Sequence, residues 1–252
     1  PRFVSTSPYF QSPNRKATLL NTETSATMQL VFARIDGLWD VLGPPNASGT
    51  YTAIYTVAVA PDGKVYVGGD FLNFDNQATG DYLAYYDKVT DTWGAVSALN
   101  GAVQAIAIAA NGDVYFAGSF TNAGGVAAAD NIAKWDGSSV TAVGTPNTGA
   151  ASITSINALV FDGQGRLWIG GTYTNLNDNA NADYIAYWDG SAYFAISTGA
   201  NGTVNALAYD AVADRIIIGG EFTTLGGGGA AKVGYYSWQE SAFGAYGTGT
   251  TG

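Results

Sequence analysis

The chain has 252 residues and a formal net charge of −10, and 12% of its residues are charged while 47% are hydrophobic. Such a chain can build one large β domain or two ordinary domains with an ample core. The acidic balance and the lack of a Lys/Arg run exclude the basic surface that nucleic-acid binding requires. Cysteine and histidine are absent, which excludes disulfides, thiolate catalysis, Ser-His-Asp triads and metals bound by Cys or His.

Targeting signals are also missing from the sequence. No apolar run reaches the roughly 18 residues of a transmembrane helix, so membrane insertion is not expected. The first ten residues, PRFVSTSPYF, lack the apolar core of a secretory signal. If Pro1 is the natural start, removal of an initiator methionine predicts a protein made in the cytoplasm without export. A processed precursor or a trimmed chain is the alternative.

A repeat of about 50 residues organises the sequence. Its anchor is a glycine followed, one residue later, by an aromatic residue, in the segments VYVGGDF, VYFAGSF, LWIGGTY and IIIGGEF. The anchor glycines are Gly69, Gly118, Gly171 and Gly220, so the steps are 49, 53 and 49 residues. This recurrence predicts four copies of one supersecondary unit.

Each unit holds four short runs with strand character, here called a, b, c and d in chain order. Run a alternates apolar residues, run b carries the anchor, run c follows a loop, and run d closes the unit after a turn. The first unit has runs at 54–60, 65–71, 83–87 and 92–96, the second at 103–109, 114–120, 132–136 and 139–143, the third at 156–161, 167–173, 185–189 and 192–196, and the fourth at 204–210, 216–222, 233–238 and 242–246. Four short antiparallel strands per unit describe a β-propeller blade.

An incomplete unit precedes the first full one. Residues 32–37 align with residues 132–137 as run c, and residues 38–42 follow as run d. In the second unit run a begins 29 positions before Ile132, and the same offset from Phe32 leads to Phe3.

Two interpretations of the N-terminal segment stay open. Residues 3–10 and 13–20 can form a degenerate a–b pair, which makes the segment a half-blade that completes a fifth blade. Alternatively, residues 1–30 are an extended arm, because PYFQSPNRK and NTETSAT have the composition of loops. In both interpretations residues 31–252 form one β-propeller domain, and the chain is a single domain.

The repeat resembles kelch-like propellers and the related repeats of large surface proteins. The shared motifs are the double glycine, Phe-Thr and Ile-Ala-x-Trp-Asp-Gly, found here at Gly68-Gly69, Gly170-Gly171 and Gly219-Gly220, at Phe120-Thr121 and Phe222-Thr223, and at residues 132–137 and 185–190. The resemblance implies a ring of blades around a channel, with ligands held by loops on one face, but no single function. The style is also similar to repeats of bacteriophage tail and surface proteins.

The chain departs from this pattern in two units. The second unit has Ala117 in place of the first glycine, and the fourth has Tyr236-Ser237-Trp238 in place of Trp-Asp-Gly. Copper oxidases of this superfamily are poor guides, because they need His and Cys ligands.

The loops between runs b and c carry the most varied polar groups. The candidate binding residues are Asp75, Asp81, Asn177, Asp178, Asn179, Asn181 and Asp183. Their oxygens suit Ca²⁺, with Asp178 and Asp183 as the candidate ligands, but the spacing lacks the glycine and distal Glu of an EF-hand. Asx side chains commonly hydrogen-bond nearby backbone and hold turns. We therefore expect no metal or cofactor, with Ca²⁺ as the alternative.

Two further patterns have a structural and a functional interpretation. Asp81, Asp130 and Asp183 recur two residues before run c, which predicts loop-closing acceptors rather than ligands. Aromatic residues gather on run c, where filling the wedge between blades is favoured over stacking on sugars.

Catalysis by carboxylates has one candidate pair. Asp70 and Glu221 occupy the same repeat position and could hydrolyse glycosides if they lay roughly 5–10 Å apart. The equivalent positions of the other units hold Ser119 and Thr172, so no catalytic residue is assigned.

We predict an all-β protein, a β-propeller of about five four-stranded blades, made of four full repeats and a degenerate N-terminal unit. The predicted function is a non-enzymatic structural or binding module exposed on a virion, in a bacteriophage tail or capsid surface. Its expected partners are other virion or surface proteins, copies of itself, and a host-surface glycan. The alternative is a carbohydrate-binding adhesion propeller that is extracellular or on a bacterial cell surface, and the third is a glycan-acting enzyme using carboxylates.

Overall fold

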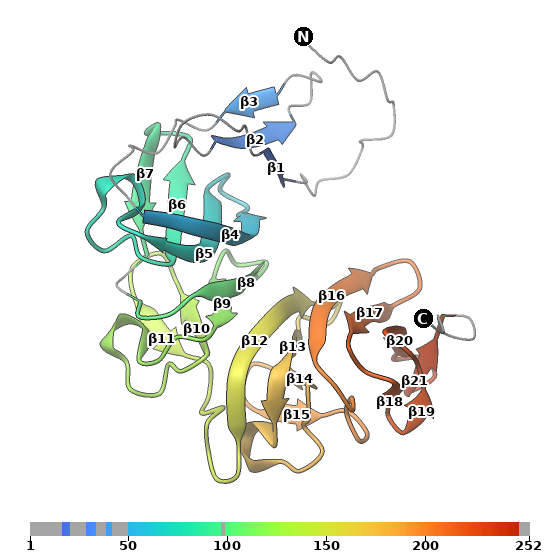
Figure 1. Cartoon of the computed structure of the whole chain (residues 1–252). Helices are drawn as coiled ribbons and strands as arrows, with labels where there is room; N and C mark the ends of the chain where they lie inside the picture. Colours follow the sequence, from blue (N-terminus) through green and yellow to red (C-terminus); the bar gives the residue numbers. More distant parts are fainter. Residues whose placement is uncertain (1–16, 21–28, 34–38, 42–49, 97–98, 247–252) are drawn as a thin grey trace.

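Alternating apolar residues and tight turns fold residues 50–246 into four antiparallel sheets that follow one another round an arc (Figure 1). The computed structural model describes residues 17–20, 29–33, 39–41, 50–96 and 99–246. Each sheet is one repeat and is called a blade here. In every blade the strands lie side by side in chain order, as the β-propeller prediction requires.

The strand bounds agree closely with the predicted runs. The first blade is β4 (Thr50–Val59), β5 (Val65–Leu72), β6 (Leu83–Asp87) and β7 (Thr92–Ala95). The second is β8 (Val103–Ile108), β9 (Val114–Gly118), β10 (Ile132–Trp135) and β11 (Val140–Ala142). The third is β12 (Ser152–Phe161), β13 (Leu167–Thr174), β14 (Ile185–Trp188) and β15 (Tyr193–Ala195). The fourth is β16 (Val204–Asp210), β17 (Arg215–Gly220), β20 (Val233–Ser237) and β21 (Ala242–Ala245).

Short elements fill the loops between the second and third strands of the blades. The 3₁₀ turns η1 (Phe74–Asn76), η2 (Ala123–Gly125) and η3 (Leu176–Asp178) lie in the first three blades. A small hairpin of β18 (Thr224–Leu225) and β19 (Gly228–Gly229) takes this place in the fourth. No helix of the described residues has the length and apolar character needed to cross a membrane.

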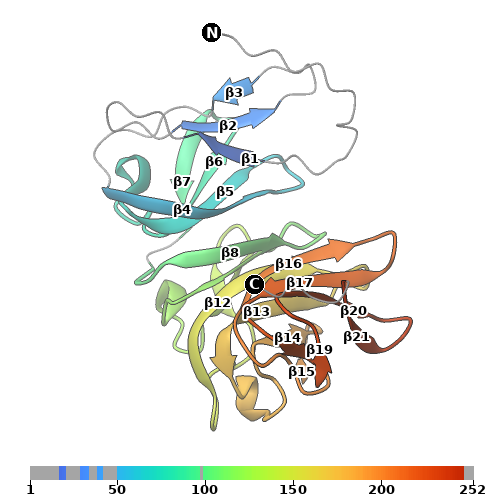
Figure 2. The same cartoon turned by 45° about the vertical axis from the view of Figure 1, so that its right-hand side comes forward.

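A three-stranded antiparallel sheet precedes the first blade. It consists of β1 (Ala17–Leu20), β2 (Gln29–Ala33) and β3 (Trp39–Val41), in that order. Figures 1 and 2 both place this sheet beside the β4–β7 blade. Residues 3–10, the proposed run a, lie outside the described residues, so the choice between arm and half-blade stays a prediction.

Most of the core lies between the blades, and one cluster, which includes Val67, Phe71 and Phe74, lies inside the first blade. The innermost strands β4, β8, β12 and β16 pack against each other in sequence. Buried residues then form clusters across each boundary: Leu83 of the first blade with Phe116 of the second, Ala117 of the second with Ile156 of the third, and Trp168 of the third with Ile218 of the fourth. Each blade is therefore stabilised by apolar surface of its neighbour.

The anchor glycines mark the closest backbone approach inside each blade. A Cβ atom on Gly69, Gly118, Gly171 or Gly220 would lie 2.2, 2.0, 2.4 or 2.1 Å from a carbonyl oxygen of the innermost strand or of the residue just before it. At each position the innermost strand carries a β-bulge, which pushes its backbone toward the glycine. The anchor repeats because no side chain fits there.

Candidate functional site

Two ends of the blades offer loops for binding. The loops between second and third strands, which contain all the predicted binding residues, leave the sheets at one end. The turns between first and second strands and between third and fourth strands leave at the opposite end, because neighbouring strands are antiparallel. The predicted residues therefore share one face of the arc.

The recurring aspartates close their own loops. Asp81, Asp130 and Asp183 each accept a hydrogen bond from the backbone N–H eight residues earlier, at 2.7, 2.7 and 2.8 Å. The donors are Asn73, Asn122 and Asn175, which all have φ between 50° and 53°. Asn tolerates this left-handed conformation better than most residues, so the turn and its acceptor recur together. This is the loop-closing role that the repeat predicts.

The polar residues of the third loop are also engaged within the protein. Asp178 Oδ1 accepts from the Ala150 N–H at 2.8 Å, and Asn177 Oδ1 accepts from the Thr148 hydroxyl at 3.2 Å. Asn179 Oδ1 accepts from the Asn181 N–H at 3.1 Å. The bonds of Asp178 and Asn177 join the loop to the segment that precedes β12, whereas the bond of Asn179 lies within the loop. In the first blade the Asp75 N–H donates to the Tyr51 hydroxyl at 3.3 Å.

The candidate calcium ligands are not brought together as a cage. Asp178 and Asp183 accept backbone N–H groups from different segments, at Ala150 and Asn175. Across the described part of the chain, no three acidic side chains gather closely enough to hold a metal ion. Asp183 thus closes its own loop, and Asp178 bonds the backbone of the segment that precedes β12.

A cavity of about 350 Å³ lies at the opposite end of the blades, between the first and the second. Its walls combine aromatic rings with the charged turns of both blades. The aromatic residues are Tyr66, Tyr85 and Trp135, and the charged residues are Asp62, Lys64, Asp113 and Asp136. Sequence reasoning did not select these turns, although each has an Asp or Asn beside a glycine.

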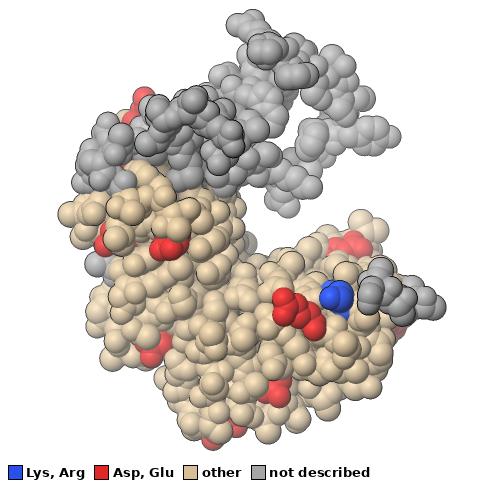
Figure 3. Space-filling view, viewed as in Figure 1, with Lys and Arg blue, Asp and Glu red and all other residues tan. Residues whose placement is uncertain are grey.

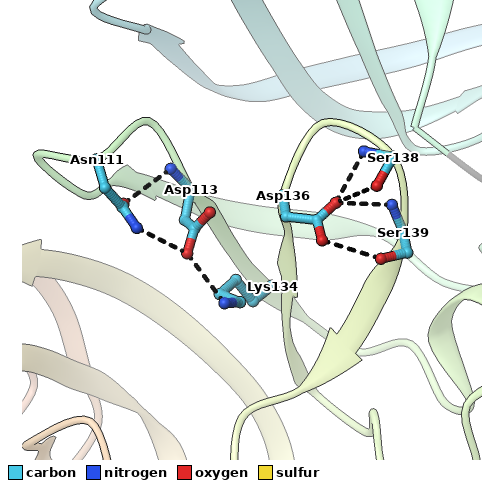
Figure 4. Close-up of polar contacts among 6 residues, drawn as sticks. All are labelled: Asn111, Asp113, Lys134, Asp136, Ser138 and Ser139. Carbon is cyan, nitrogen blue, oxygen red and sulfur yellow. Dashed lines mark hydrogen bonds and ion pairs between the residues drawn. The ribbon is translucent and has the colours of Figure 1, made fainter.

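Ion pairs hold the charged groups of this cavity in place. Lys64 donates to Asp62 at 2.6 Å, and Lys134 donates to Asp113 at 2.9 Å (Figure 4). Burial alone would raise the pKa of Asp62, but its hydrogen bonds from Lys64 outweigh that effect and lower it. The hydrogen bond to Asp113 raises the pKa of Lys134. These shifts favour the charged forms of Asp62 and Lys134.

Asp136 caps the turn at the cavity rim. Its carboxylate accepts the backbone N–H groups of Ser138 and Ser139, each at 2.8 Å, and both hydroxyls (Figure 4). These bonds, led by the Ser139 N–H, lower the pKa of Asp136 far below its usual range. Burial raises the pKa of the neighbouring Tyr66 to about 12. The cavity therefore presents the ionised carboxylates of Asp62 and Asp136 and the neutral phenol of Tyr66.

A second cavity, of about 340 Å³, lies between the third and fourth blades and is lined by Tyr187, Tyr236, Trp238 and Phe243 among others. Behind it, the Asp162 carboxylate is fully buried and accepts from Arg166 Nε at 2.7 Å and Trp168 Nε1 at 3.0 Å. The Arg166 guanidinium lies over the Trp238 ring, 3.3 Å from its centroid. The departure of the fourth unit from Trp-Asp-Gly was the one sequence signal that pointed here.

Two more predicted features have a place in the structure. Asp70 is in the first blade and Glu221 in the last of the four, at the two ends of the arc (Figure 1). Among the aromatic residues of run c, Tyr86 and Tyr236 are buried, as the packing interpretation expects. The surface charge agrees with the acidic composition: on the face drawn in Figure 3, acidic side chains are scattered and little basic surface is seen.

Comparisons with known proteins agree on the fold. A family model described as "Two component regulator propeller" matches residues 152–173, which are β12, its turn and most of β13. No curated protein matches the sequence significantly. The solved structures that match include a GH74 enzyme from Niastella koreensis, at 15% identity and a TM-score of 0.55, covering 89% of this chain and 36% of that one.

Other matches are of similar strength. A gluconolactonase from Xanthomonas campestris has 13% identity and a TM-score of 0.50, with 86% and 70% of the two chains covered. A protein described as the extracellular domain of a one-component system from B. thetaiotaomicron has 14% identity and a TM-score of 0.47, with 81% and 28% covered. The chain spans about a third of the length of the first and last of these three proteins. The likeness to the GH74 enzyme and to the gluconolactonase, at 15% and 13% identity, shows the propeller fold and no activity.

Proposed function

We propose that this chain is a non-enzymatic structural and binding propeller, exposed on a bacteriophage particle as part of its tail or capsid surface. The non-enzymatic part of the proposal rests on the hydrogen bonds that the loop carboxylates make. Asp81, Asp130, Asp178 and Asp183 all accept backbone N–H groups that hold loops. A general acid needs a carboxyl whose pKa is raised toward neutrality, whereas the shifted aspartates Asp62, Asp136 and Asp189 all have lowered pKa values.

The scaffold character supports exposure on a particle. Loops fixed by their own side chains hold one shape without metal or partner, which suits a surface that is displayed and handled outside cells. The repeat of this chain is rich in small residues and weakly charged, and in this it resembles the repeats of surface proteins. The expected partners are other particle proteins or copies of the chain.

Antibodies against the purified chain test this proposal on particles banded by density from the source culture. We expect the antigen to co-sediment with particles and gold-labelled antibody to decorate their tail or capsid. Antigen found only in particle-free medium or on cell envelopes would contradict the virion assignment. Replacing Asp70 and Glu221 with Asn and Gln should leave particle association unchanged.

A second candidate function, carbohydrate binding, is favoured by the cavity between the first two blades. Tyr85 and Trp135 offer ring faces beside the carboxylates of the cavity and the ammonium group of Lys64, a combination that can stack on a sugar and bond its hydroxyls. Binding of a glycan array by the isolated chain would support it, and Trp135→Ala should then weaken binding about tenfold or more. Phe194→Ala, which removes an exposed ring outside this cavity, is the matched control. Equal loss in both variants, or no array signal, would count against this function.

A further inference from the structure

The fourth blade departs from the third at positions that line the cavity between them. Trp188 pairs with Tyr193 across the last two strands of the third blade, and Tyr236 pairs with Phe243 in the same place of the fourth. The fourth blade therefore has the smaller ring on one strand and lacks a hydroxyl on the other. Trp238 takes the position of the glycine in the Trp-Asp-Gly motif. The fourth blade thus has less side-chain volume inside the junction and an additional ring at its end.

The preceding junction, between the second and third blades, is filled more tightly at the same place. There a Cβ on Gly144 would lie 2.7 Å from Cζ3 of Trp188. Ser197 is equivalent to Gly144, because each lies two residues past the fourth strand of its blade. Ser197 has a side chain and lines the cavity of about 340 Å³ beside the smaller rings. The residues that open this cavity are therefore particular to one junction.

Aromatic rings from both blades form the walls of this cavity. Tyr187 comes from the third blade, and Tyr236, Trp238 and Phe243 come from the fourth. The ring centroids of Tyr187 and Trp238 are 5.7 Å apart, and Tyr236 lies 5.0 Å from Trp238 and 5.2 Å from Phe243. The Arg166 guanidinium, 3.3 Å from the Trp238 centroid, holds that ring in place. Walls that are ordered in advance lower the entropic cost of binding a ligand.

Hydrogen-bonding groups lie among these rings. Ser197 and Ser241 bring two hydroxyls to the lining, and Tyr187 and Tyr236 bring two phenols. The indole Nε1 of Trp238 is buried and has no acceptor among the described residues. A buried N–H without an acceptor is unfavourable, so the site favours a ligand with oxygen atoms over a purely apolar one.

The lining of the cavity carries no charge. Among the described residues that line it, none is Asp, Glu, Lys or Arg. Burial is the main cause that raises the pKa of Tyr187 and of Tyr236, so both phenols stay neutral at pH 7. Arg166, behind the Trp238 ring, is already paired with the buried Asp162 carboxylate. A charged ligand would lose water here without gaining a counter-charge.

We propose that the cavity between the third and fourth blades binds one or two pyranose rings of a neutral sugar. A pyranose has C–H faces that pack on aromatic rings and hydroxyls that donate and accept hydrogen bonds, which matches this lining. The volume lies near the lower end of the range of about 300–1,000 Å³ for ligand cavities, so a short ligand fits. The inference depends neither on the proposed virion function nor on the carbohydrate site between the first two blades.

Calorimetric titration of the full chain tests the ligand class. The neutral probes are methyl glucoside, methyl galactoside, methyl mannoside, N-acetylglucosamine and cellobiose, and the charged probes are the corresponding uronic acids and amino sugars. We expect at least one neutral probe to bind, and its charged counterparts to bind at least about tenfold more weakly, because their charge would be desolvated without a partner. Binding of no neutral probe, or equal binding of the charged ones, would overturn the proposal.

Single substitutions test the place of binding. Tyr187→Ala removes the wall that the third blade supplies and should weaken binding about tenfold or more. Trp135→Ala is the matched control, because it removes a ring from the cavity between the first two blades, and it should bind as the unmodified chain does. Unchanged binding by Tyr187→Ala, or an equal loss in Trp135→Ala, would show that the sugar is held elsewhere. A loss in Trp135→Ala alone would support the other carbohydrate site and reject this one.

A triple variant fills the cavity with rings that the protein already packs at another junction. Ser197→Gly, Tyr236→Trp and Phe243→Tyr, made together, copy the residues between the second and third blades. We expect this variant to keep the circular dichroism spectrum of the unmodified chain and to lose sugar binding. A folded triple variant that still binds the sugar with unchanged affinity would overturn the proposal. If the variant does not fold, the comparison of Tyr187→Ala with Trp135→Ala decides.

Discussion

At the scale of single residues, the anchor glycines are the positions least able to accept a side chain. A Cβ on Gly118 would lie 2.0 Å from the Ala102 carbonyl oxygen, and neither backbone can withdraw without breaking the sheet. We expect Gly118→Ala to lower the free energy of unfolding by about 1–3 kcal/mol or more, measured by urea denaturation. Gly229→Ala is the control, because a Cβ there meets nothing within 4 Å. A Gly118→Ala variant as stable as the control would refute the close-approach explanation.

Asp136 makes the free energy of unfolding depend on pH in the acid range. Its folded-state pKa is lowered by hydrogen bonds to its ionised form, so its contribution is present above the unfolded pKa near 3.8 and is lost as the pH falls through the folded value. Asp136→Asn should therefore destabilise at pH 7, and the difference from the unmodified chain should shrink below about pH 4. Urea titrations at several pH values check this. A difference that stays constant down to pH 2 would mean that the charge of Asp136 is irrelevant.

At the scale of elements, the threonine of the Phe-Thr motif is hydrogen-bonded to the connection that leads into its blade. Asn201 Oδ1 accepts the N–H groups of Thr223 and Thr224 at 2.8 and 2.9 Å, and its Nδ2 donates to the Thr223 hydroxyl at 2.7 Å. Asn100 makes the corresponding bonds to Thr121. The motif thus combines a buried Phe with a threonine that holds the connection entering its own blade.

Removing these bonds at Asn201 should loosen the fourth blade. Asn201→Ala removes the acceptor of two exposed backbone N–H groups, which costs about 0.5–1.5 kcal/mol for each bond. The loss should speed hydrogen exchange in β16 and in residues 223–225. Thr223→Val keeps both backbone N–H bonds to Asn201 Oδ1 and loses only the hydroxyl bond, so it serves as the milder comparison. If Asn201→Ala exchanges no faster than Thr223→Val, the backbone bonds are not what holds the connection.

The blades could be predicted from sequence because each is specified locally. The alternation of apolar residues, the turns and the anchor glycines give every strand of the four blades within a few residues, and the recurring aspartates give the loop acceptors. Contacts between blades carry no such periodic signal. The stacking of Arg166 on Trp238 joins residues 72 positions apart, and Arg166 is held in place by Asp162, four positions before it. The cavity between the first two blades is likewise assembled from turns that are ordinary when considered singly.

At the scale of the whole molecule, the Arg166 side chain connects the third and fourth blades. Its guanidinium bonds the fully buried Asp162 carboxylate on one side and lies over the Trp238 ring on the other. Arg166→Ala leaves a buried charge unpaired, so we expect a loss of about 3–5 kcal/mol. Arg166→Lys keeps a charge but not the planar stacking, and should fall between. Thermal unfolding followed by tryptophan fluorescence measures both variants. Equal stability of the Ala and Lys variants would show that the pairing, and not the stacking, is unimportant.

The innermost strands of the four blades stack mainly each against the next, and this order has a mechanical consequence. A linear array of units with nearest-neighbour contacts frays from its ends, where a unit has one partner instead of two. In an open arc the last blade would therefore be the first to be cut by a protease, and cleavage would advance blade by blade toward the N-terminus. A ring has no last blade, and a single cut in one of its connections would leave every sheet held from both sides.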